Sequence, residues 1–214
     1  MKTISIIVPV YQNEENLPHT IPKLLSLREQ LRGYSFELLF VDDGSTDGSF
    51  EELKKFQERN PDAIHLIRLS RNFGQTPAIQ AGLRHASGNC VGIISADLQE
   101  PYQKFVDMVR IWEGGKKFIF GERVSREEKA SHQFFSNLYW KMIRRFSMGN
   151  FPQAGYDFCL MDRQVVEDLN KINEKNTSIF ALIFWLGYQP TALKIDRKLR
   201  KAGVSQWPLL KKIR

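Results

Sequence analysis

The stretch FELLFVDDGSTDGS, residues 36–49, decides the fold. Its first six residues, FELLFV, form an almost continuous apolar run, as in a strand that is buried on both faces of a sheet. The polar second half ends that strand and leads into a helix predicted over 46–60, where Phe50, Leu53 and Phe56 recur at helical spacing. A buried strand, a polar loop and a helix in this order form the repeating unit of a parallel α/β sheet.

The same alternation of strand and helix continues on both sides of this unit. We expect further strands at 3–10, 64–69, 91–95 and 117–121. We expect further helices at 24–31 (entered near Pro18 or Pro22), 77–86 and 101–112. Later in the chain we expect a long helix at 130–147, a strand at 156–161, helices at 163–171 and 178–187, and a last strand at 190–196.

Repeated units of this length imply an α/β fold with a mainly parallel, doubly wound sheet. We expect one domain over 1–196, followed by a basic segment at 197–214. In such sheets ligands bind outside the carboxyl ends of the strands. The loops that follow the strands are therefore the places to look for a functional site.

The positive charge of the chain is confined to its last residues. The sequence has 31 Lys and Arg against 24 Asp and Glu, a formal charge of +7. Residues 194–214 hold eight of the basic residues and one acid, so the rest of the chain has 23 of each and is neutral. This distribution argues against a protein that binds nucleic acid over a broad basic face. It leaves a local basic segment that needs a partner of its own.

Two cysteines and the apolar stretches bear on the compartment. Cys90 and Cys159 have neither zinc-site nor CxxC spacing, and we expect reduced thiols in the core and a reducing compartment. The apolar N-terminus passes straight into a polar motif, so it is read as a strand and not as a signal peptide. The longest apolar stretch, 179–188, is about half of what a membrane-spanning helix needs.

Two strand ends carry side chains suited to a nucleotide. Asp42 and Asp43 follow the second strand, where two carboxylates are able to hold a base edge and ribose hydroxyls; the alternative is an ordinary turn with a helix cap. Arg71 and Gly74 follow the third strand and precede a helix, an arrangement that binds anions. Here the alternative is a surface arginine and a glycine in a left-handed turn.

The end of the fourth strand offers oxygen ligands for a cation. Asp97 and Gln99 are two residues apart, so in an extended segment their side chains point to the same side. A carboxylate and an amide oxygen suit a divalent cation such as Mg²⁺, whose other ligands are waters and substrate phosphates.

Five motifs together resemble those of family-2 glycosyltransferases. They are VPVYQNEEN (8–16), VDDGSTD (41–47), RNFGQTPAIQAGL (71–83), SADLQEP (95–101) and AGYDFCLMDR (154–163). More narrowly, the chain is similar to the branch that moves a sugar from a nucleotide to a polyprenyl phosphate, which includes dolichol-phosphate mannose synthases and bactoprenol glucosyltransferases. The resemblance implies a GT-A (Rossmann-like) fold and an inverting, metal-dependent hexosyltransferase that uses Mg²⁺ or Mn²⁺.

The resemblance also implies which residues form the donor site. It places Pro9, Tyr11 and Glu15 along the nucleotide, Asp42 at the base, Gly74 and Gln75 near the base and ribose, and Asp97 and Gln99 on the metal. The family usually has an acid where this chain has Ser95, so either Asp97 and Gln99 bind the metal with the help of the diphosphate, or metal dependence is reduced. We favour the first, because the diphosphate itself supplies oxygens and negative charge.

The acceptor side is implied by the same resemblance. Arg123 matches the acceptor-phosphate arginine, with Arg126 assisting and Ser136 nearby, although these arginines have solvated surface residues as their alternative. His132 replaces a second family arginine. An acceptor phosphate is already anionic at neutral pH and needs no strong base. We therefore assign Asp157 to orienting the acceptor or sugar, with general base as the alternative.

Three further features of the second half stay open at this stage. Cys159 stands where relatives commonly have an arginine, and Arg163 is equally well read as a helix-start residue or as a pocket contact. The helix predicted at 130–147 has two interpretations: its apolar face packs on the protein core, or it lies on a membrane surface.

The last segment resembles the family's closing segment followed by an amphipathic helix. Ser205, Gln206 and Trp207 are expected to close over the donor phosphates, while the basic residues face anionic lipid headgroups. Relatives of this branch commonly continue into membrane-spanning helices at this point. The sequence is therefore either a naturally short peripheral form or a piece that stops before the membrane segments, and we favour the second.

We expect an enzyme that transfers a sugar from a UDP-sugar to a polyprenyl phosphate such as undecaprenyl phosphate, at the cytoplasmic face of the cell membrane, for a cell-envelope glycan. The alternatives are a glycosyltransferase that acts on a growing polysaccharide and a non-catalytic nucleotide-sugar-binding protein. The expected partners are the donor, the lipid acceptor and the membrane surface, without nucleic acid. A homo-oligomer is compatible with the sequence.

Overall fold

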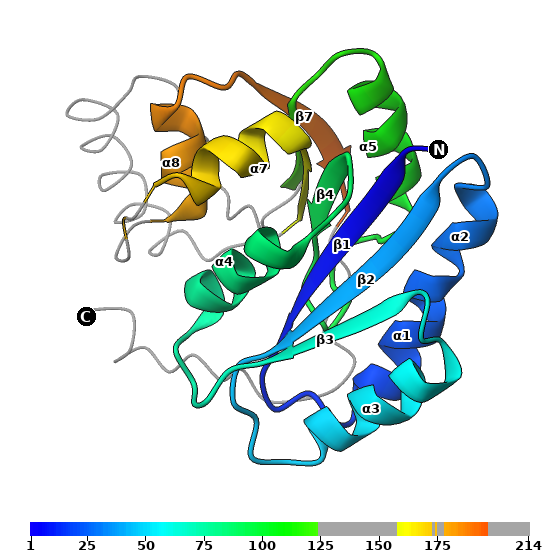
Figure 1. The fold of residues 1–214 in the computed structure, drawn as a ribbon. Coiled ribbons are helices and arrows are strands. Elements are labelled where there is room, and N and C mark those ends of the chain that lie inside the picture. Colours follow the sequence, from blue (N-terminus) through cyan, green and yellow to red (C-terminus); the bar gives the residue numbers. More distant parts are fainter. Residues whose placement is uncertain (124–157, 173, 175–177, 197–214) are drawn as a thin grey trace, which may run out of the picture.

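A seven-stranded sheet forms the centre of the computed structural model, which describes residues 1–123, 158–172, 174 and 178–196 (Figure 1). The strands are β1 (Thr3–Val10), β2 (Ser35–Asp42), β3 (Ile64–Arg68), β4 (Cys90–Ile93), β5 (Phe118–Arg123), β6 (Cys159–Asp162) and β7 (Pro190–Ile195). Their order across the sheet is β3-β2-β1-β4-β6-β5-β7. The helices are α1 (Leu17–Leu25), α2 (Leu27–Gln30), α3 (Ser49–Arg59), α4 (Gln75–His85), α5 (Lys104–Glu113), α7 (Arg163–Asn170) and α8 (Ile179–Trp185).

The carboxyl ends of the first strands lie along one edge of the sheet. β1 runs parallel to both β2 and β4, and β2 runs parallel to β3. The register places Val10 opposite Asp42, and Asp42 opposite Arg68. In Figure 1, β1, β2 and β3 converge at their carboxyl ends toward the lower left of the molecule, and β4 ends opposite Ile7, closer to the middle of β1. The order reverses between β1 and β4, which is where doubly wound sheets bind ligands.

The other half of the sheet makes it mixed. β6 pairs antiparallel with both β4 and β5, whereas β5 and β7 are parallel. The prediction of a mainly parallel α/β sheet is therefore confirmed, with the antiparallel pairings confined to β6. Sequence periodicity does not report strand direction, so this detail was not accessible from the residues.

Helices cover both faces of the sheet and bury a separate core on each. One core contains Ile4, Ile6 and Phe40 and is covered by α1, α2, α3 and α5. The opposite core contains Ile7 and Leu39 and is covered by α4, α7 and α8. Alternate residues of β1 and β2 thus enter opposite cores, as expected when successive side chains of a strand point to opposite faces. The reading of FELLFV as a strand buried on both faces is confirmed.

The first helix differs from the prediction of a helix at 24–31. α1 begins at Leu17, and Leu27 opens the separate short helix α2. The spacing of Leu17, Ile21 and Leu24 carries α1 onto the core, where all three are fully buried. Burying side chains of this size contributes about 1.5–3 kcal/mol each, which offsets the backbone hydrogen bond that Pro22 removes inside the helix.

The helix predicted at 46–60 begins three residues later than predicted, because Thr46 and Asp47 bond to the loop after β1. α3 starts at Ser49, and the preceding side chains bond to a neighbouring loop, as described below. The remaining elements lie within a few residues of their predicted positions. The predicted 130–147 helix lies outside the described residues.

The two cysteines are buried and free, as predicted. Burial raises the pKa of the Cys90 thiol above its ordinary range, which keeps it protonated and unreactive. In the part of the chain that the structure describes, none of the helices is both long and apolar enough to cross a membrane.

The contact between Tyr188 and Asp168 gives folding stability a dependence on alkaline pH. The Tyr188 hydroxyl donates to Asp168 Oδ2 at 2.6 Å, and burial together with this bond raises the Tyr188 pKa from 10.0 to about 12. Because the folded state favours the neutral phenol, its contribution to stability is complete below pH 10 and is lost between pH 10 and about 12.

We expect Tyr188→Phe to reduce this alkaline loss of stability. Chemical denaturation of both proteins on either side of pH 10 measures the effect. The difference in unfolding free energy between wild type and variant should shrink as the pH rises. A difference that is constant across this range would show that the phenol does not titrate as described.

Candidate active site

The loop after β1 is fastened to the loop after β2 by two buried serines. The backbone N–H of Gln12 donates to Ser45 Oγ at 3.0 Å, and that of Asn13 donates to Ser49 Oγ at 2.8 Å. The exposed fractions are 4% for Ser45 and 0% for Ser49, so these bonds are shielded from water. Gln12 has φ 51, a left-handed conformation that a non-glycine residue holds only with such support.

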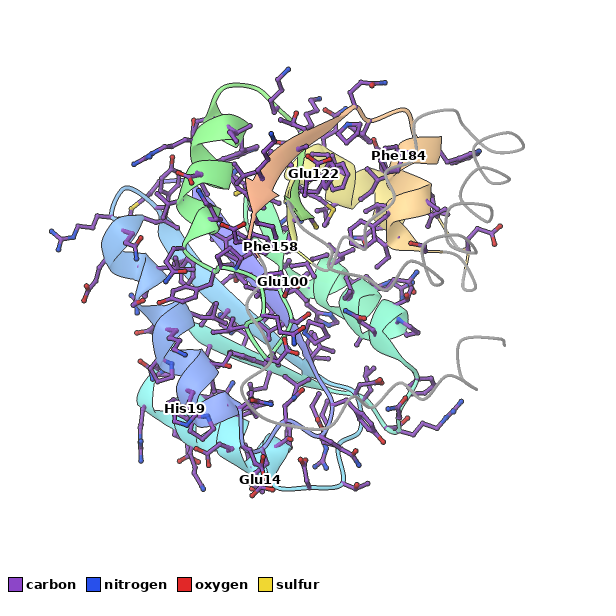
Figure 2. All side chains as sticks on the ribbon, turned by 180° about the vertical axis from the view of Figure 1, so that it is seen from behind. Glu14, His19, Glu100, Glu122, Phe158 and Phe184 are labelled. Atoms are coloured by element: carbon purple, nitrogen blue, oxygen red, sulfur yellow. The ribbon has the colours of Figure 1, made fainter. Side chains whose placement is uncertain are left out.

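A reciprocal pair of bonds extends this connection at the protein surface. The Glu14 N–H donates to Asp47 Oδ2 at 3.3 Å, and the Gly48 N–H donates to Glu14 Oε2 at 2.8 Å. Figure 2 shows Glu14 at the edge of the molecule where these loops meet. We call the bonds from 12–14 to 45–49 the loop clasp. The second half of the DDGSTDGS motif therefore fixes the neighbouring loop, in addition to leading into α3.

Asp43 joins the end of β2 to the loop after β3. Its two carboxylate oxygens accept the backbone N–H groups of Phe73 and Gly74, both at 2.8 Å. Burial raises the pKa of Asp43, the two backbone donors oppose that shift, and the neighbouring Asp42 adds to it. Sequence reasoning identified Asp43 as a site residue but did not foresee that it shapes the RNFG loop.

Asp42 lies inside the protein. It is 0% exposed, its Oδ1 accepts the Ser45 N–H at 3.2 Å, and its Oδ2 lies 3.3 Å from Arg68 Nε. The Arg68 guanidinium in turn stacks 4.3 Å from the Phe50 ring. These contacts make Asp42 a support for the turn, and its contact with a nucleobase stays a prediction.

The RNFG loop presents an arginine and an aromatic ring together. The Arg71 guanidinium lies 4.2 Å from the centre of the Phe73 ring, and both side chains are exposed. Gly74 has φ 100 and directly precedes α4, which begins at Gln75. The prediction that Gly74 leads into a helix is confirmed, and the positive end of that helix faces the same edge.

The predicted contacts after β1 lie at the same edge. Pro9 is paired with Val41 in the sheet, and Tyr11 follows the strand with a half-buried side chain. Glu15 is exposed, just before α1. The structure thus brings Pro9, Tyr11 and Glu15 to the carboxyl ends of the strands that also carry Asp43.

The segment after β4 is a turn, and this corrects our reasoning about Asp97 and Gln99. The Leu98 N–H donates to Ser95 O at 3.2 Å, and Leu98 has φ 46. The two-residue periodicity of an extended segment therefore does not apply here. A hydrogen bond connects the two residues instead: the Gln99 N–H donates to Asp97 Oδ1 at 3.3 Å.

Glu100 is a buried acid at this edge whose burial the sequence did not predict. It is 1% exposed and lies in the interior of the molecule, directly after the turn (Figure 2). A buried carboxylate is uncommon and is held by partners. Nothing in its local sequence, SADLQEP, distinguishes Glu100 from a surface acid before a helix. Its burial becomes visible only in the folded structure.

The turn fits a hard divalent cation that is also held by phosphates. Asp97 and Gln99 are both half-buried and offer a carboxylate and an amide oxygen. Within the described ranges, no three His, Cys, Asp or Glu side chains come together as a metal site. A cation here would therefore depend on ligands from a bound substrate, which is the usual situation of Mg²⁺ in enzymes that use nucleotides.

Arg163 has a structural role. Its Nε donates to Gly88 O at 2.7 Å, and its Nη2 donates to Ala86 O at 2.9 Å. Both carbonyls follow α4, at the edge of the sheet opposite to Asp97. Of the two alternatives open from the sequence, Arg163 is thus a helix-start residue that holds a loop.

The other predicted site residues lie at the end of β5 or outside the described residues. Arg123 is the last residue of β5, and only its backbone is described. Asp157 adjoins Phe158, which is buried 4.8 Å from the Phe105 ring. The predicted residues that lie outside the described ranges are Arg126, Ser136, Asp157, Ser205, Gln206 and Trp207.

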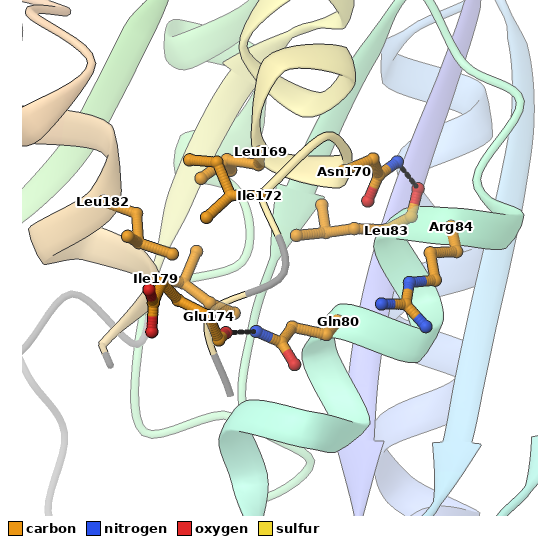
Figure 3. A pocket seen from close by; sticks show the side chains of 9 residues that line it. All are labelled: Gln80, Leu83, Arg84, Leu169, Asn170, Ile172, Glu174, Ile179 and Leu182. Carbon is orange, nitrogen blue, oxygen red and sulfur yellow. Dashed lines mark hydrogen bonds between the residues drawn. The ribbon is translucent and has the colours of Figure 1, made fainter. Parts of the chain in front are cut away.

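A small pocket lies elsewhere, between α4, α7 and α8 (Figure 3). Its walls combine apolar side chains such as Leu83, Leu169 and Leu182 with polar groups, and Gln80 donates to Glu174 O beside it. None of the predicted site residues lines it. The polar loops at the carboxyl ends of β1, β2, β3 and β4 therefore remain the candidate active site.

Comparison with known proteins identifies the family of this chain. The model of the family described as "Glycosyl transferase family 2" matches residues 5–169. The chain belongs to this family. An uncharacterised glycosyltransferase of Bacillus subtilis, YkcC, is 34% identical over 98% of this chain and 65% of its own length. A bactoprenol glucosyl transferase of Shigella phage SfV is 30% identical over 95% of this chain and 66% of its own length.

The chain spans just under two thirds of the length of these curated relatives of the glycosyltransferase family. Solved structures confirm the GT-A fold. Glucosyl-3-phosphoglycerate synthase of Mycobacterium tuberculosis has a TM-score of 0.67 at 16% identity, covering 99% of this chain and 75% of that one. A mannosyltransferase of Pyrobaculum calidifontis, solved with GDP-mannose and Mn²⁺, has a TM-score of 0.63 at 18% identity, covering 94% and 58%.

Proposed function

We propose that this family-2 glycosyltransferase moves a sugar from a UDP-sugar to a polyprenyl phosphate, with inversion, at the cytoplasmic face of a membrane. The observation that carries the proposal is the joining of the loops after β1, β2 and β3 at the sheet edge where β4 also ends, in a chain 30% identical to bactoprenol glucosyl transferases. These loops supply aromatic, carboxylate, amide and cationic groups, which are the groups a nucleotide-sugar requires.

The nucleoside would lie over the ends of β1, β2 and β3. Tyr11 offers a ring for stacking, and Asp43 holds the RNFG loop so that Arg71 and the start of α4 face the same space. Glu15 is exposed beside it. Gly74 and Gln75 would approach the base and ribose, since a glycine lets backbone come close to a ligand.

The diphosphate would lie at the turn after β4. Asp97 and Gln99 would hold Mg²⁺ or Mn²⁺ there, and such a cation neutralises the charge that develops on the departing nucleoside diphosphate. Ser95 takes the place of an acid, so the protein contributes one carboxylate from Asp97 and relies on the phosphates for further negative charge. The Arg71 guanidinium would also contact the diphosphate. The closing residues Ser205, Gln206 and Trp207 would cover it.

The acceptor phosphate would attack the anomeric carbon from the other side of the sugar. It is anionic at neutral pH, so its oxygen needs placement and no strong base. Arg123 at the end of β5, with Arg126 and Ser136, would bind this phosphate, and Asp157 would orient the acceptor or the sugar hydroxyls. The basic residues of 197–214 would bring the site to the anionic membrane surface, where each contributes about 1 kcal/mol.

A donor panel incubated with undecaprenyl phosphate tests the proposal. Lipid-linked sugar should form with UDP-glucose or another UDP-sugar. Label in a soluble glycan instead of the lipid would establish the polysaccharide alternative. Tight nucleotide binding without turnover of any donor would establish the non-catalytic alternative.

Arg123→Ala should weaken the acceptor side selectively. Loss of a charge-assisted contact to a phosphate is expected to lower kcat/KM for the lipid by about 100-fold. Donor hydrolysis in water should change little, because the donor lies over other loops. Arg59→Ala at the far end of α3 is the matched control and should behave as wild type. Equal losses in lipid transfer and donor hydrolysis would contradict an acceptor role for Arg123.

A further inference from the structure

A buried threonine of α1 holds the turn that carries Asp97. Thr20 Oγ1 donates to Ala96 O at 2.6 Å, across 76 residues of sequence. Thr20 and Ala96 are each 3% exposed, so the bond is inside the protein. β4 ends at Ile93, and Ala96 therefore lies beyond the sheet ladder that would otherwise bind its carbonyl. Thr20 supplies the partner that this carbonyl needs.

The same turn stores conformational strain. Leu98 has φ 46, which a branched side chain adopts only when its surroundings impose it. Within the turn, the Leu98 N–H bonds to Ser95 O, and the Gln99 N–H bonds to Asp97 Oδ1, at 3.2 and 3.3 Å. The bond from Thr20 is shorter than both and comes from outside the turn. Strain that persists at such a site is part of how the site is shaped.

α1 is itself fixed at its amino end. The loop clasp binds residues 12–14 to residues 45–49, and α1 begins at Leu17, only three residues later. Leu17, Ile21 and Leu24 lock the helix onto the core. Thr20 therefore reaches the turn after β4 from a helix that cannot shift freely.

We propose that Thr20 is a positioning residue for Asp97. Its hydroxyl fixes the peptide between Ala96 and Asp97, and thereby the direction in which the Asp97 carboxylate leaves the backbone. α1 thus links the nucleoside half of the site, at Tyr11, to the diphosphate half, at Asp97. This inference rests on the proposed function, because it gives Asp97 the role of cation ligand.

Two substitutions separate the hydroxyl from the volume of the side chain. Thr20→Val keeps the volume and removes the hydroxyl, whereas Thr20→Ser keeps the hydroxyl and loses the methyl group. Thr20→Ala, which also lacks the hydroxyl, is a second variant should the valine protein fold poorly. Electron paramagnetic resonance of free Mn²⁺ measures Mn²⁺ binding to each protein saturated with UDP, and calorimetry measures UDP binding without metal.

We expect Thr20→Val to weaken Mn²⁺ binding by about 10-fold, the size of effect seen when the support of a metal ligand is removed. Thr20→Ser should bind Mn²⁺ within about twofold of wild type. Thr20→Val and Thr20→Ser should both lower Tm. UDP affinity without metal should be unchanged in both.

Mn²⁺ affinity in Thr20→Val equal to that of wild type would overturn the inference. So would a loss of Mn²⁺ affinity that follows Tm in both variants, because that result describes a purely structural residue. Wild-type protein that binds UDP but holds no Mn²⁺ would overturn the cation site of the proposed function, and the inference with it. The wild-type measurement therefore tells the two failures apart.

Discussion

Asp97→Asn is expected to lower kcat for sugar transfer by about 1000-fold, the effect of removing one charged group that stabilises a leaving group. Asparagine keeps the shape of the side chain and an oxygen that accepts the Gln99 N–H, so the turn should survive. What it removes is the only carboxylate assigned to the cation. Steady-state kinetics with UDP-sugar and lipid acceptor over a range of Mn²⁺ concentrations measures the loss.

The matched control for this change is Asp107→Asn. Asp107 is a partly exposed acid of α5 that bonds to Lys104 on the same helix. It should leave kcat within about twofold of wild type, as surface ion pairs contribute little. Activity of Asp97→Asn within tenfold of wild type would contradict the assigned role, and would favour the reading in which Ser95 marks a site of reduced metal dependence.

Gly44→Ala is expected to destabilise the protein by about 3–5 kcal/mol, from left-handed strain together with a steric clash. Gly44 has φ 69, and a Cβ there would lie 2.4 Å from the backbone carbonyl carbon of Arg71 and 2.8 Å from Asn72 N. These atoms are main chain and have no room to move without shifting the RNFG loop. The change should also weaken UDP binding, because that loop would leave Asp43.

Two other glycines provide graded controls. Gly74 has φ 100 but open space around it, so Gly74→Ala should cost only the strain, about 1–3 kcal/mol. Gly33 has neither feature, and Gly33→Ala should change stability by no more than about 1 kcal/mol. Urea denaturation ranks the three proteins. An unfolding free energy of Gly44→Ala equal to that of Gly74→Ala would show that the loops do not pack as described.

The fold was predictable because its signals are local. Runs such as FELLFV and the helical spacing of Phe50, Leu53 and Phe56 specify burial before any tertiary contact is known. The helix predicted at 24–31 was misplaced because Pro18 and Pro22 were taken to mark the approach to a helix that begins after them. In the structure the helix includes both prolines, since the burial of Leu17 and Ile21 outweighs the hydrogen bond lost at Pro22.

The candidate site was only partly predictable, because its contacts join distant residues. The serines of DDGSTDGS look like turn formers, and nothing in the motif shows that Ser45 and Ser49 bind the loop after β1. The direction of a side chain after β4 was predicted from an extended segment that the structure replaces with a turn at Leu98. Residue types thus predicted the chemistry at the carboxyl ends of the strands. The geometry of the loops there became known only from the folded structure.

The central claim is that a nucleotide binds at the carboxyl ends of β1, β2, β3 and β4. A crystal structure of the protein with UDP and Mn²⁺ tests it directly. The account predicts the uracil beside Tyr11 and the turn that contains Asp42 and Asp43, and the diphosphate with Mn²⁺ at Asp97. UDP bound in the pocket between α4, α7 and α8, or anywhere away from these four loops, would contradict it.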